Sequence, residues 1–82
     1  MNTKSIIGKK ISYYDGFSGS TTTYTITNVE FDGQGYKVMG DGWAEFLFFG
    51  TKAMKQLIET GRFEQTLTID HCPVRETYEI QG

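Results

Sequence analysis

The stretch that most constrains the fold of this chain runs from residue 43 to residue 61. Residues 43–49 form an aromatic strand pattern that passes through Gly50 into the one convincing helical pattern of the sequence. The residues before this stretch follow strand and turn patterns, and the residues after it are typical of one further pair of strands. We therefore expect residues 43–61 to lie at the centre of the core.

A helix is predicted over residues 51–60. Met54, Leu57 and Ile58 fall at i, i+3 and i+4, so they form one narrow apolar stripe. Thr51 is expected to cap the first turn through its hydroxyl, and Gly61 is expected to end the helix in the left-handed conformation. A helix of about ten residues is marginal by itself in water. It must therefore dock its stripe on a sheet.

The strand before this helix is apolar on both faces. Side chains alternate along a strand, so Phe46 and Phe48 project to one face, and Trp43, Glu45 and Leu47 project to the other. We assign Phe46 and Phe48 to the core because no polar residue shares their face. The opposite face is either covered by the curled sheet or left open for a partner, and Glu45 between two apolar residues favours an open face.

The whole pattern predicts an α+β fold in a single domain, residues 1–82. The element order is ββββ-α-ββ, and the antiparallel sheet is strongly bent or forms a small, partly open barrel with the helix packed on it. The predicted strands cover residues 5–14, 21–31, 36–39, 43–49, 63–70 and 74–80. A change of apolar parity near Thr27 and Asn28 predicts a β-bulge in the second strand.

Composition excludes several classes of function. The formal net charge is −2 and the isoelectric point is about 5.2, without a long basic stripe, so duplex DNA is not an expected partner. No apolar run is long enough to span a membrane, and no signal peptide pattern begins the chain. Cys72 is the single cysteine, which excludes a disulfide within the chain and favours a cytoplasmic location.

No motif points to catalysis, a metal or another cofactor. Cys72 and His71 are sequence neighbours, and neighbours in a strand face opposite ways, so we expect a structural turn and not a catalytic pair. Asp15, Asp32 and Asp41 each precede a glycine, which is common turn chemistry and lacks the spacing of a calcium loop. We therefore expect a protein that is not an enzyme.

Exposed aromatic side chains suit a protein interface. We predict a non-enzymatic interaction module, such as a small accessory or inhibitor protein that sterically occupies the surface of a partner protein or of a second copy. The predicted contact residues are Trp43, Leu47, Tyr14 and Phe17, the last in a turn where a polar residue would be usual. The alternatives are a domain that binds a small ligand or nucleotide, and a small barrel that binds single-stranded nucleic acid.

Overall fold

The computed structural model describes residues 2–41 and 46–81. Its elements are the 3₁₀ helix η1 (Thr3–Ile6), the strands β1 (Lys10–Asp15), β2 (Ser20–Phe31), β3 (Gly35–Gly40) and β4 (Phe46–Gly50), the helix α1 (Thr51–Thr60), and the strands β5 (Arg62–Ile69) and β6 (Cys72–Gln81). Within the described residues, six antiparallel strands form one sheet in the order β4-β3-β2-β1-β6-β5, and α1 packs on it. Among these described strands, the two edge strands β4 and β5 are not paired with each other, so the sheet does not close into a barrel. The predicted α+β fold and element order are confirmed.

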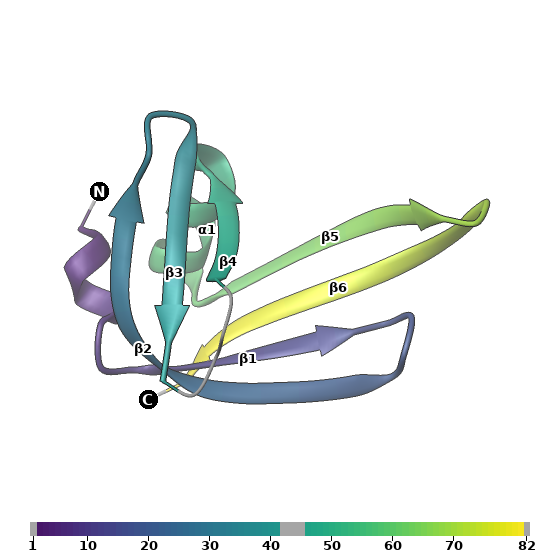
Figure 1. Cartoon of the computed structure of the whole chain (residues 1–82), viewed down its shortest axis with the longest axis horizontal. Coiled ribbons are helices and arrows are strands. Elements are labelled where there is room, and N and C mark those ends of the chain that lie inside the picture. The colour runs from purple at the N-terminus through teal and green to yellow at the C-terminus, as the bar shows by residue number, and fades with distance from the viewer. Residues whose placement is uncertain (1, 42–45, 82) are drawn as a thin grey trace.

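The long strand β2 belongs to both halves of the bent sheet. Its residues 20–25 pair with β1, and its remaining residues pair with β3, with a shift of register between Ile26 and Asn28. This shift confirms the predicted bulge, which lets the strand turn sharply. Figure 1 shows the result: β2, β3 and β4 stand upright, while β1, β5, β6 and residues 20–25 run sideways as an extension that we call the arm.

The first strand of the sheet begins at a later residue than the sequence pattern predicts. The first strand begins at Lys10, and the segment before it is η1, which places Ile6 in the core with 3% of its surface exposed. Gly8 follows with φ +92°, and its N–H donates to the carbonyl of Ile26 at 2.9 Å. The prediction of a strand from residue 5 is wrong because this positive φ turns the backbone before the ladder starts.

The helix α1 follows its predicted pattern in its buried face and in its end. Met54 and Leu57 are fully buried. Gly61 has φ +77°, and its N–H donates to the carbonyl of Leu57 at 2.9 Å. The predicted cap at Thr51 is wrong, because the N-cap residue is Gly50 and no side chain caps the first turn. The helix therefore depends on its packing and on its glycine end.

Gly61→Val is expected to lower the free energy of unfolding by about 1 kcal/mol or more, because a β-branched residue resists the positive φ at this position. Urea denaturation followed by circular dichroism measures the loss. Gly61→Asn is the matched control, since asparagine tolerates the left-handed region better than valine does, and it should cost clearly less. Equal losses for the two variants would contradict the assigned role of this backbone conformation.

The turn between β5 and β6 contains two residues in the left-handed region. Asp70 has φ +51° and His71 has φ +65°, and they join the paired residues Ile69 and Cys72 as a two-residue hairpin loop. Such loops favour Asn-Gly, because both central residues need positive φ. The turn thus lies at Asp70 and His71, and Cys72 already belongs to β6.

The double variant Asp70→Asn/His71→Gly is expected to raise the free energy of unfolding by about 1 kcal/mol, because it removes backbone strain from two exposed residues. The melting temperature and urea midpoint should both rise. The control Asp70→Asn/His71→Val keeps the first change and adds a β-branched residue at positive φ, so its stability should fall. A fall in both variants would show that the turn is not strained in the native protein.

The core lies where the two halves of the sheet meet α1. Its buried members include Ile11, Tyr24, Ile26, Val38, Leu47, Phe49, Met54, Leu57 and Tyr78. The ring of Phe49 meets the ring of Tyr78 edge-on, with 4.8 Å between centroids, and that of Phe63 at 6.2 Å. These aromatic contacts join β4 to β5 and β6 across the inside of the bend.

The faces of β4 are the reverse of the predicted assignment. Leu47 and Phe49 are 9% and 3% exposed, whereas Phe46 and Phe48 are 46% and 48% exposed. The prediction that Phe46 and Phe48 belong to the core is therefore wrong. The physical reason is the path of the chain: α1 follows β4 directly and packs Met54 and Leu57 into the same cluster as Leu47 and Phe49.

Candidate interaction surface

Two half-exposed phenylalanines lie on the face of β4 that points away from α1. Phe46 and Phe48 alternate with the buried residues Leu47 and Phe49, so their rings share one side of the strand. Their cross-strand neighbours on β3 are Met39 and Lys37 respectively. We call the surface made by Phe46, Phe48, Lys37 and Met39 the phenyl face.

The phenyl face is held in place by its β3 neighbours. The Nζ atom of Lys37 lies 4.8 Å from the ring centroid of Phe46, which is within cation–π distance. The ring of Phe48 lies over Gly35, because a Cβ atom at Gly35 would come within 2.6 Å of its Cζ atom. Because Gly35 has no side chain, the ring of Phe48 can pack directly against the backbone of β3. Each ring thus packs against β3 while half exposed, and side chains that are already packed lose less entropy on binding.

The phenyl face borders an open edge of the sheet. Strand β4 has β3 on one side and no described strand on the other, so alternate backbone N–H and C=O groups point outward. Proteins commonly protect such edges with charges, prolines or bulges, and residues 46–50 contain neither a charge nor a proline. Within the described residues, the outer edge of β4 is therefore unpaired by any strand and apolar.

The other edge strand, β5, carries the usual protection. Arg62 forms ion pairs with Glu64 and, at 3.3 Å, with Glu79. The hydrogen bond and charge of Arg62 lower the pKa of the Glu64 carboxyl, so the pair stays charged at neutral pH. A strand that added to this edge would have to desolvate these charges. The contrast with β4 makes β4 the better candidate for an interaction edge.

Of the four predicted contact residues, the structure describes three, and it does not bring these three together. Leu47 is in the core, so its placement on an exposed face is wrong. Trp43 lies outside the described residues. Tyr14 and Phe17 are 40% and 63% exposed and belong to the arm, at β1 and at the turn that follows it. Sequence reasoning assigned the phenyl face to the core because β4 has no polar residue on that side. The signal for solvent exposure lies on β3, where the charged residue Lys37 is paired with Phe48.

The turn that carries Phe17 is ordered by Asp15. One carboxylate oxygen of Asp15 accepts the backbone N–H of Phe17 at 2.9 Å, and the other accepts the hydroxyl of Ser18 at 3.3 Å. Gly19 completes the turn with φ +73° and donates its N–H to the carbonyl of Asp15 at 2.8 Å. This arrangement presents Phe17 to solvent at the end of the arm.

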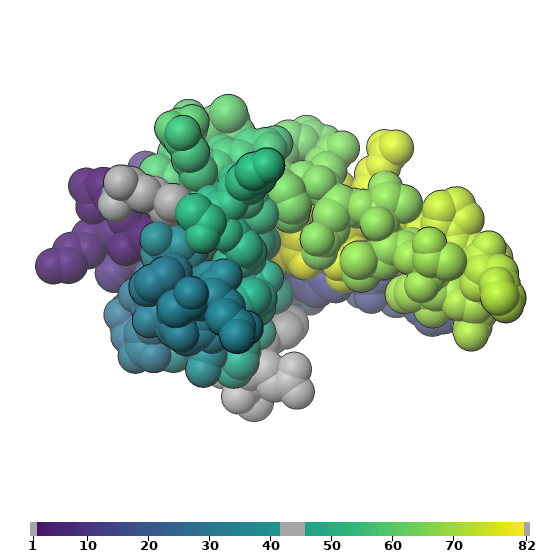
Figure 2. Space-filling view, turned by 90° about the horizontal axis from the view of Figure 1, so that it is seen from above, coloured from purple at the N-terminus to yellow at the C-terminus, as the bar shows by residue number. Residues whose placement is uncertain are grey.

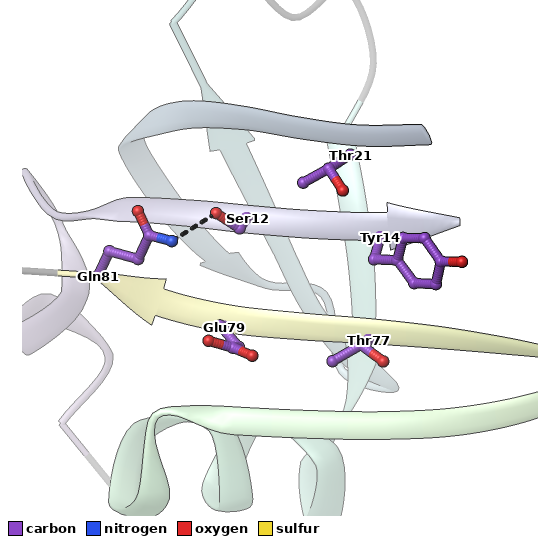
Figure 3. Close-up of a pocket in the computed structure, with 6 residues that line it drawn as sticks. All are labelled: Ser12, Tyr14, Thr21, Thr77, Glu79 and Gln81. Atoms are coloured by element: carbon purple, nitrogen blue, oxygen red, sulfur yellow. Dashed lines mark hydrogen bonds between the residues drawn. The ribbon is translucent and has the colours of Figure 1, made fainter. Parts of the chain in front are cut away.

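Tyr14 borders an open, polar depression of about 240 Å³ on the arm. Figure 3 shows the side chains that line it, which come from β1, β2 and β6: Ser12, Tyr14, Thr21, Thr77, Glu79 and Gln81. The amide of Gln81 donates to the hydroxyl of Ser12 at 2.8 Å at one end of the depression. Hydroxyl, amide and carboxylate groups surround one aromatic ring, an arrangement that suits a small polar ligand more than an apolar one.

A second polar group lies on the opposite face of the arm, around Glu76. Its carboxylate accepts hydrogen bonds from the hydroxyl of Tyr13, from the amide of Gln65 at 2.9 Å and from the hydroxyl of Tyr78 at 3.4 Å. Burial raises the pKa of Tyr78 to about 12, and burial together with the Glu76 hydrogen bond raises the pKa of Tyr13. Both hydroxyls therefore stay protonated at neutral pH as donors to Glu76, and the cluster supports the stacked rings of Tyr13 and Tyr78.

In residues 2–41 and 46–81, no three His, Cys, Asp or Glu side chains come together as metal ligands. Cys72 is an exposed free thiol in β6, directly after the turn that contains His71. No helix among the described residues combines the length and apolar character needed to cross a membrane.

Comparison with known proteins adds no further assignment. No protein-family model matches this chain, and neither a curated protein nor a solved structure matches it. The functional argument therefore rests on the chemistry of the phenyl face and of the Tyr14 depression.

Proposed function

We propose that this protein is a non-enzymatic interaction module that binds another protein through the phenyl face and the edge of β4. The observation that carries the proposal is the half exposure of two neighbouring phenylalanines, Phe46 and Phe48, on an edge strand without charges. Aromatic anchors of this kind contribute strongly to protein interfaces. Occupation of a partner's surface by this edge would act sterically, as an accessory or inhibitor protein does.

The mode of binding follows from the backbone of β4. An extended segment of the partner can add to the open edge by main-chain hydrogen bonds, while Phe46 and Phe48 contact its side chains on one face. Met39 and the aliphatic stem of Lys37 extend the apolar surface beside the rings. The expected partner segment is therefore extended and apolar on alternate residues. The exposed thiol of Cys72 suits the reducing cytoplasm, the location that we propose.

The test is a comparison of immobilised variants. Wild type, Phe48→Lys and the control Phe31→Lys are exposed to native lysate in parallel at about 0.05 M and about 0.5 M NaCl. Phe31 is 60% exposed and lies on β2, away from the β4 edge, so Phe31→Lys controls for non-specific binding by exposed aromatic side chains. The proposal expects one protein retained by wild type and Phe31→Lys at both salt concentrations and lost from Phe48→Lys. If Phe48→Lys retains the same protein as wild type does, the proposal is wrong.

The Tyr14 depression supports a second candidate function, the binding of a small polar ligand or of single-stranded nucleic acid. Tyr14 offers a ring for stacking, and Gln81 also borders a neighbouring depression that contains Lys9 and Lys10. The carboxylate of Glu79, which lines the depression, would repel a phosphate, and this favours the protein-binding proposal. Tyr14→Ala distinguishes the two: it should abolish nucleotide or oligonucleotide shifts in NMR spectra while protein retention is unchanged.

A further inference from the structure

The outer face of the arm presents one aromatic ring among hydroxyl groups. Tyr14 has the opposite parity to the buried residue Ile11 on β1, so its ring lies on the face that points away from the core. It pairs with Thr21 of β2 and with Thr77 of β6, which places a threonine on each side of it. Figures 1 and 2 show the arm projecting from the half of the molecule that contains α1. The half-exposed ring is therefore open to a ligand from solvent.

The other end of the Tyr14 depression is a row of hydrogen-bonded polar groups. The hydroxyl of Ser12 accepts a hydrogen bond from the amide of Gln81 at 2.8 Å, so its own proton is available to the hydroxyl of Thr23, 3.0 Å away. Figure 3 shows this pair at the end opposite Tyr14. The side-chain carbonyl of Gln81 accepts no hydrogen bond from the described residues. The row thus keeps an acceptor free for a ligand.

Glu79 gives the depression a negative charge. Its Oε1 atom accepts a hydrogen bond from Arg62 at 3.3 Å, and the same guanidinium also pairs with Glu64, so Arg62 is shared between two carboxylates. The residues that line the depression include this carboxylate and neither lysine nor arginine, since Lys10 borders the neighbouring depression. This charge disfavours an anionic ligand. It favours a neutral ligand that donates hydrogen bonds.

We infer that the Tyr14 depression binds one ring of a neutral carbohydrate. This rests on the second candidate function proposed above and is independent of the phenyl face. The C–H face of a sugar ring can stack on the ring of Tyr14, because the face of an aromatic ring carries a negative partial charge. Sugar hydroxyls can donate to the carboxylate of Glu79 and to the carbonyl of Gln81. The flanking threonine hydroxyls can donate or accept, as sugar hydroxyls do.

The size of the depression fits a small part of a ligand. Its volume of about 240 Å³ lies below the roughly 300–1,000 Å³ of a pocket for a drug-sized molecule. The rest of an oligosaccharide would therefore lie outside it, along the exposed strands of the arm. An open site of this size buries little ligand surface, so we expect a dissociation constant on the order of 1 mM.

The first measurement is a titration of the full chain, followed by two-dimensional amide NMR spectra. The probes are maltotriose, cellotriose and triacetylchitotriose, each up to about 20 mM. We expect saturable shifts in β1, β2 and β6 around Tyr14 with at least one of them. Tyr14→Ala should weaken this binding at least about tenfold, whereas Tyr14→Phe keeps the stacking ring and should bind within about threefold of wild type. The control Phe31→Ala removes an exposed ring outside the depression and should bind as wild type.

Two outcomes of this titration contradict the carbohydrate site. If none of the saccharides gives saturable shifts, the inference is wrong. It is also wrong if Tyr14→Ala binds as tightly as wild type. Melting curves of each variant show whether it is folded, and Tyr14→Phe separates the loss of the ring from the loss of its hydroxyl.

The second measurement tests the charge of the ligand. Glu79→Gln keeps the shape of the side chain and removes its charge, so it should weaken saccharide binding at least about threefold. Wild-type binding should be equal at about 0.05 M and about 0.5 M NaCl, because the ligand is neutral. Single-stranded oligothymidylate should give no saturable shift at the depression. If it does bind there, and Glu79→Gln strengthens that binding, the ligand is nucleic acid and the inference is wrong.

Failure of the carbohydrate site can be told apart from failure of the proposed functions. If oligothymidylate alone binds, the second candidate function stands in its nucleic-acid form. If neither probe class shifts the amides around Tyr14, the second candidate function fails together with the inference. The protein-binding proposal is tested by the lysate protein that Phe48→Lys loses, and Tyr14→Ala should retain that protein in either case.

Discussion

Phe49→Ala is expected to lower the free energy of unfolding by about 3–5 kcal/mol. The ring of Phe49 is almost fully buried and makes edge contacts with the rings of Tyr78 and Phe63. Its removal leaves a cavity where β4, β5 and β6 meet α1, and the neighbouring side chains can fill it only in part. A loss of this size is a large share of the 5–15 kcal/mol that stabilises a typical domain. Urea denaturation followed by circular dichroism measures it.

Phe46→Ala is the matched control for this prediction. It removes the same side chain from the same strand, but from the half-exposed face, where the main lost contact is the cation–π pair with Lys37. We expect a loss of less than about 1 kcal/mol. If Phe46→Ala proved as damaging as Phe49→Ala, the assignment of β4 to one buried and one exposed face would be wrong.

Gly40→Ala is expected to cost about 3 kcal/mol, through steric overlap in place of a cavity. A Cβ atom at Gly40 would overlap the ring atoms Cδ2 and Cε2 of Tyr24. Tyr24 is buried opposite Ile11 in the sheet, so its ring cannot move without displacing other core side chains. The melting temperature should fall clearly.

The control for Gly40→Ala is Gly50→Ala. Gly50 has φ −64°, which alanine adopts readily, and a Cβ atom there would have no heavy atom within 4 Å. The expected change is less than about 1 kcal/mol, because the only cost is a poorer residue at the start of α1. Comparable losses at the two glycines would show that the Tyr24 contact is not the source of the destabilisation.

Local patterns in the sequence were sufficient for the helix and for the bend of the sheet. The spacing of Met54 and Leu57 predicted the buried stripe of α1, and Gly61 predicted its end, because helix periodicity and left-handed glycine caps depend on neighbouring residues alone. The change of parity at Thr27 and Asn28 predicted the bulge in β2 for the same reason.

Features that depend on contacts between distant residues were predicted less well. The start of β1 was placed too early, because η1 docks Ile6 into a core made by later elements. The cap at Thr51 was expected from residue preference, yet Gly50 occupies the cap position once β4 runs straight into α1. Of the predicted contact residues, Tyr14 and Phe17 are exposed on the arm, where nothing in their own segments indicated how far they lie from β4.

The burial of the two faces of β4 could not be predicted from the sequence alone. Alternation along a strand determined that Phe46 and Phe48 share one face and that Leu47 and Phe49 share the other. Both faces are apolar, so the local pattern could not decide which one is buried. Tertiary structure decided it: α1 folds back over Leu47 and Phe49, and the register with β3 places Phe48 opposite the charged residue Lys37. The burial of one face depends on contacts across the sheet, and these contacts form only when the strands and the helix come together.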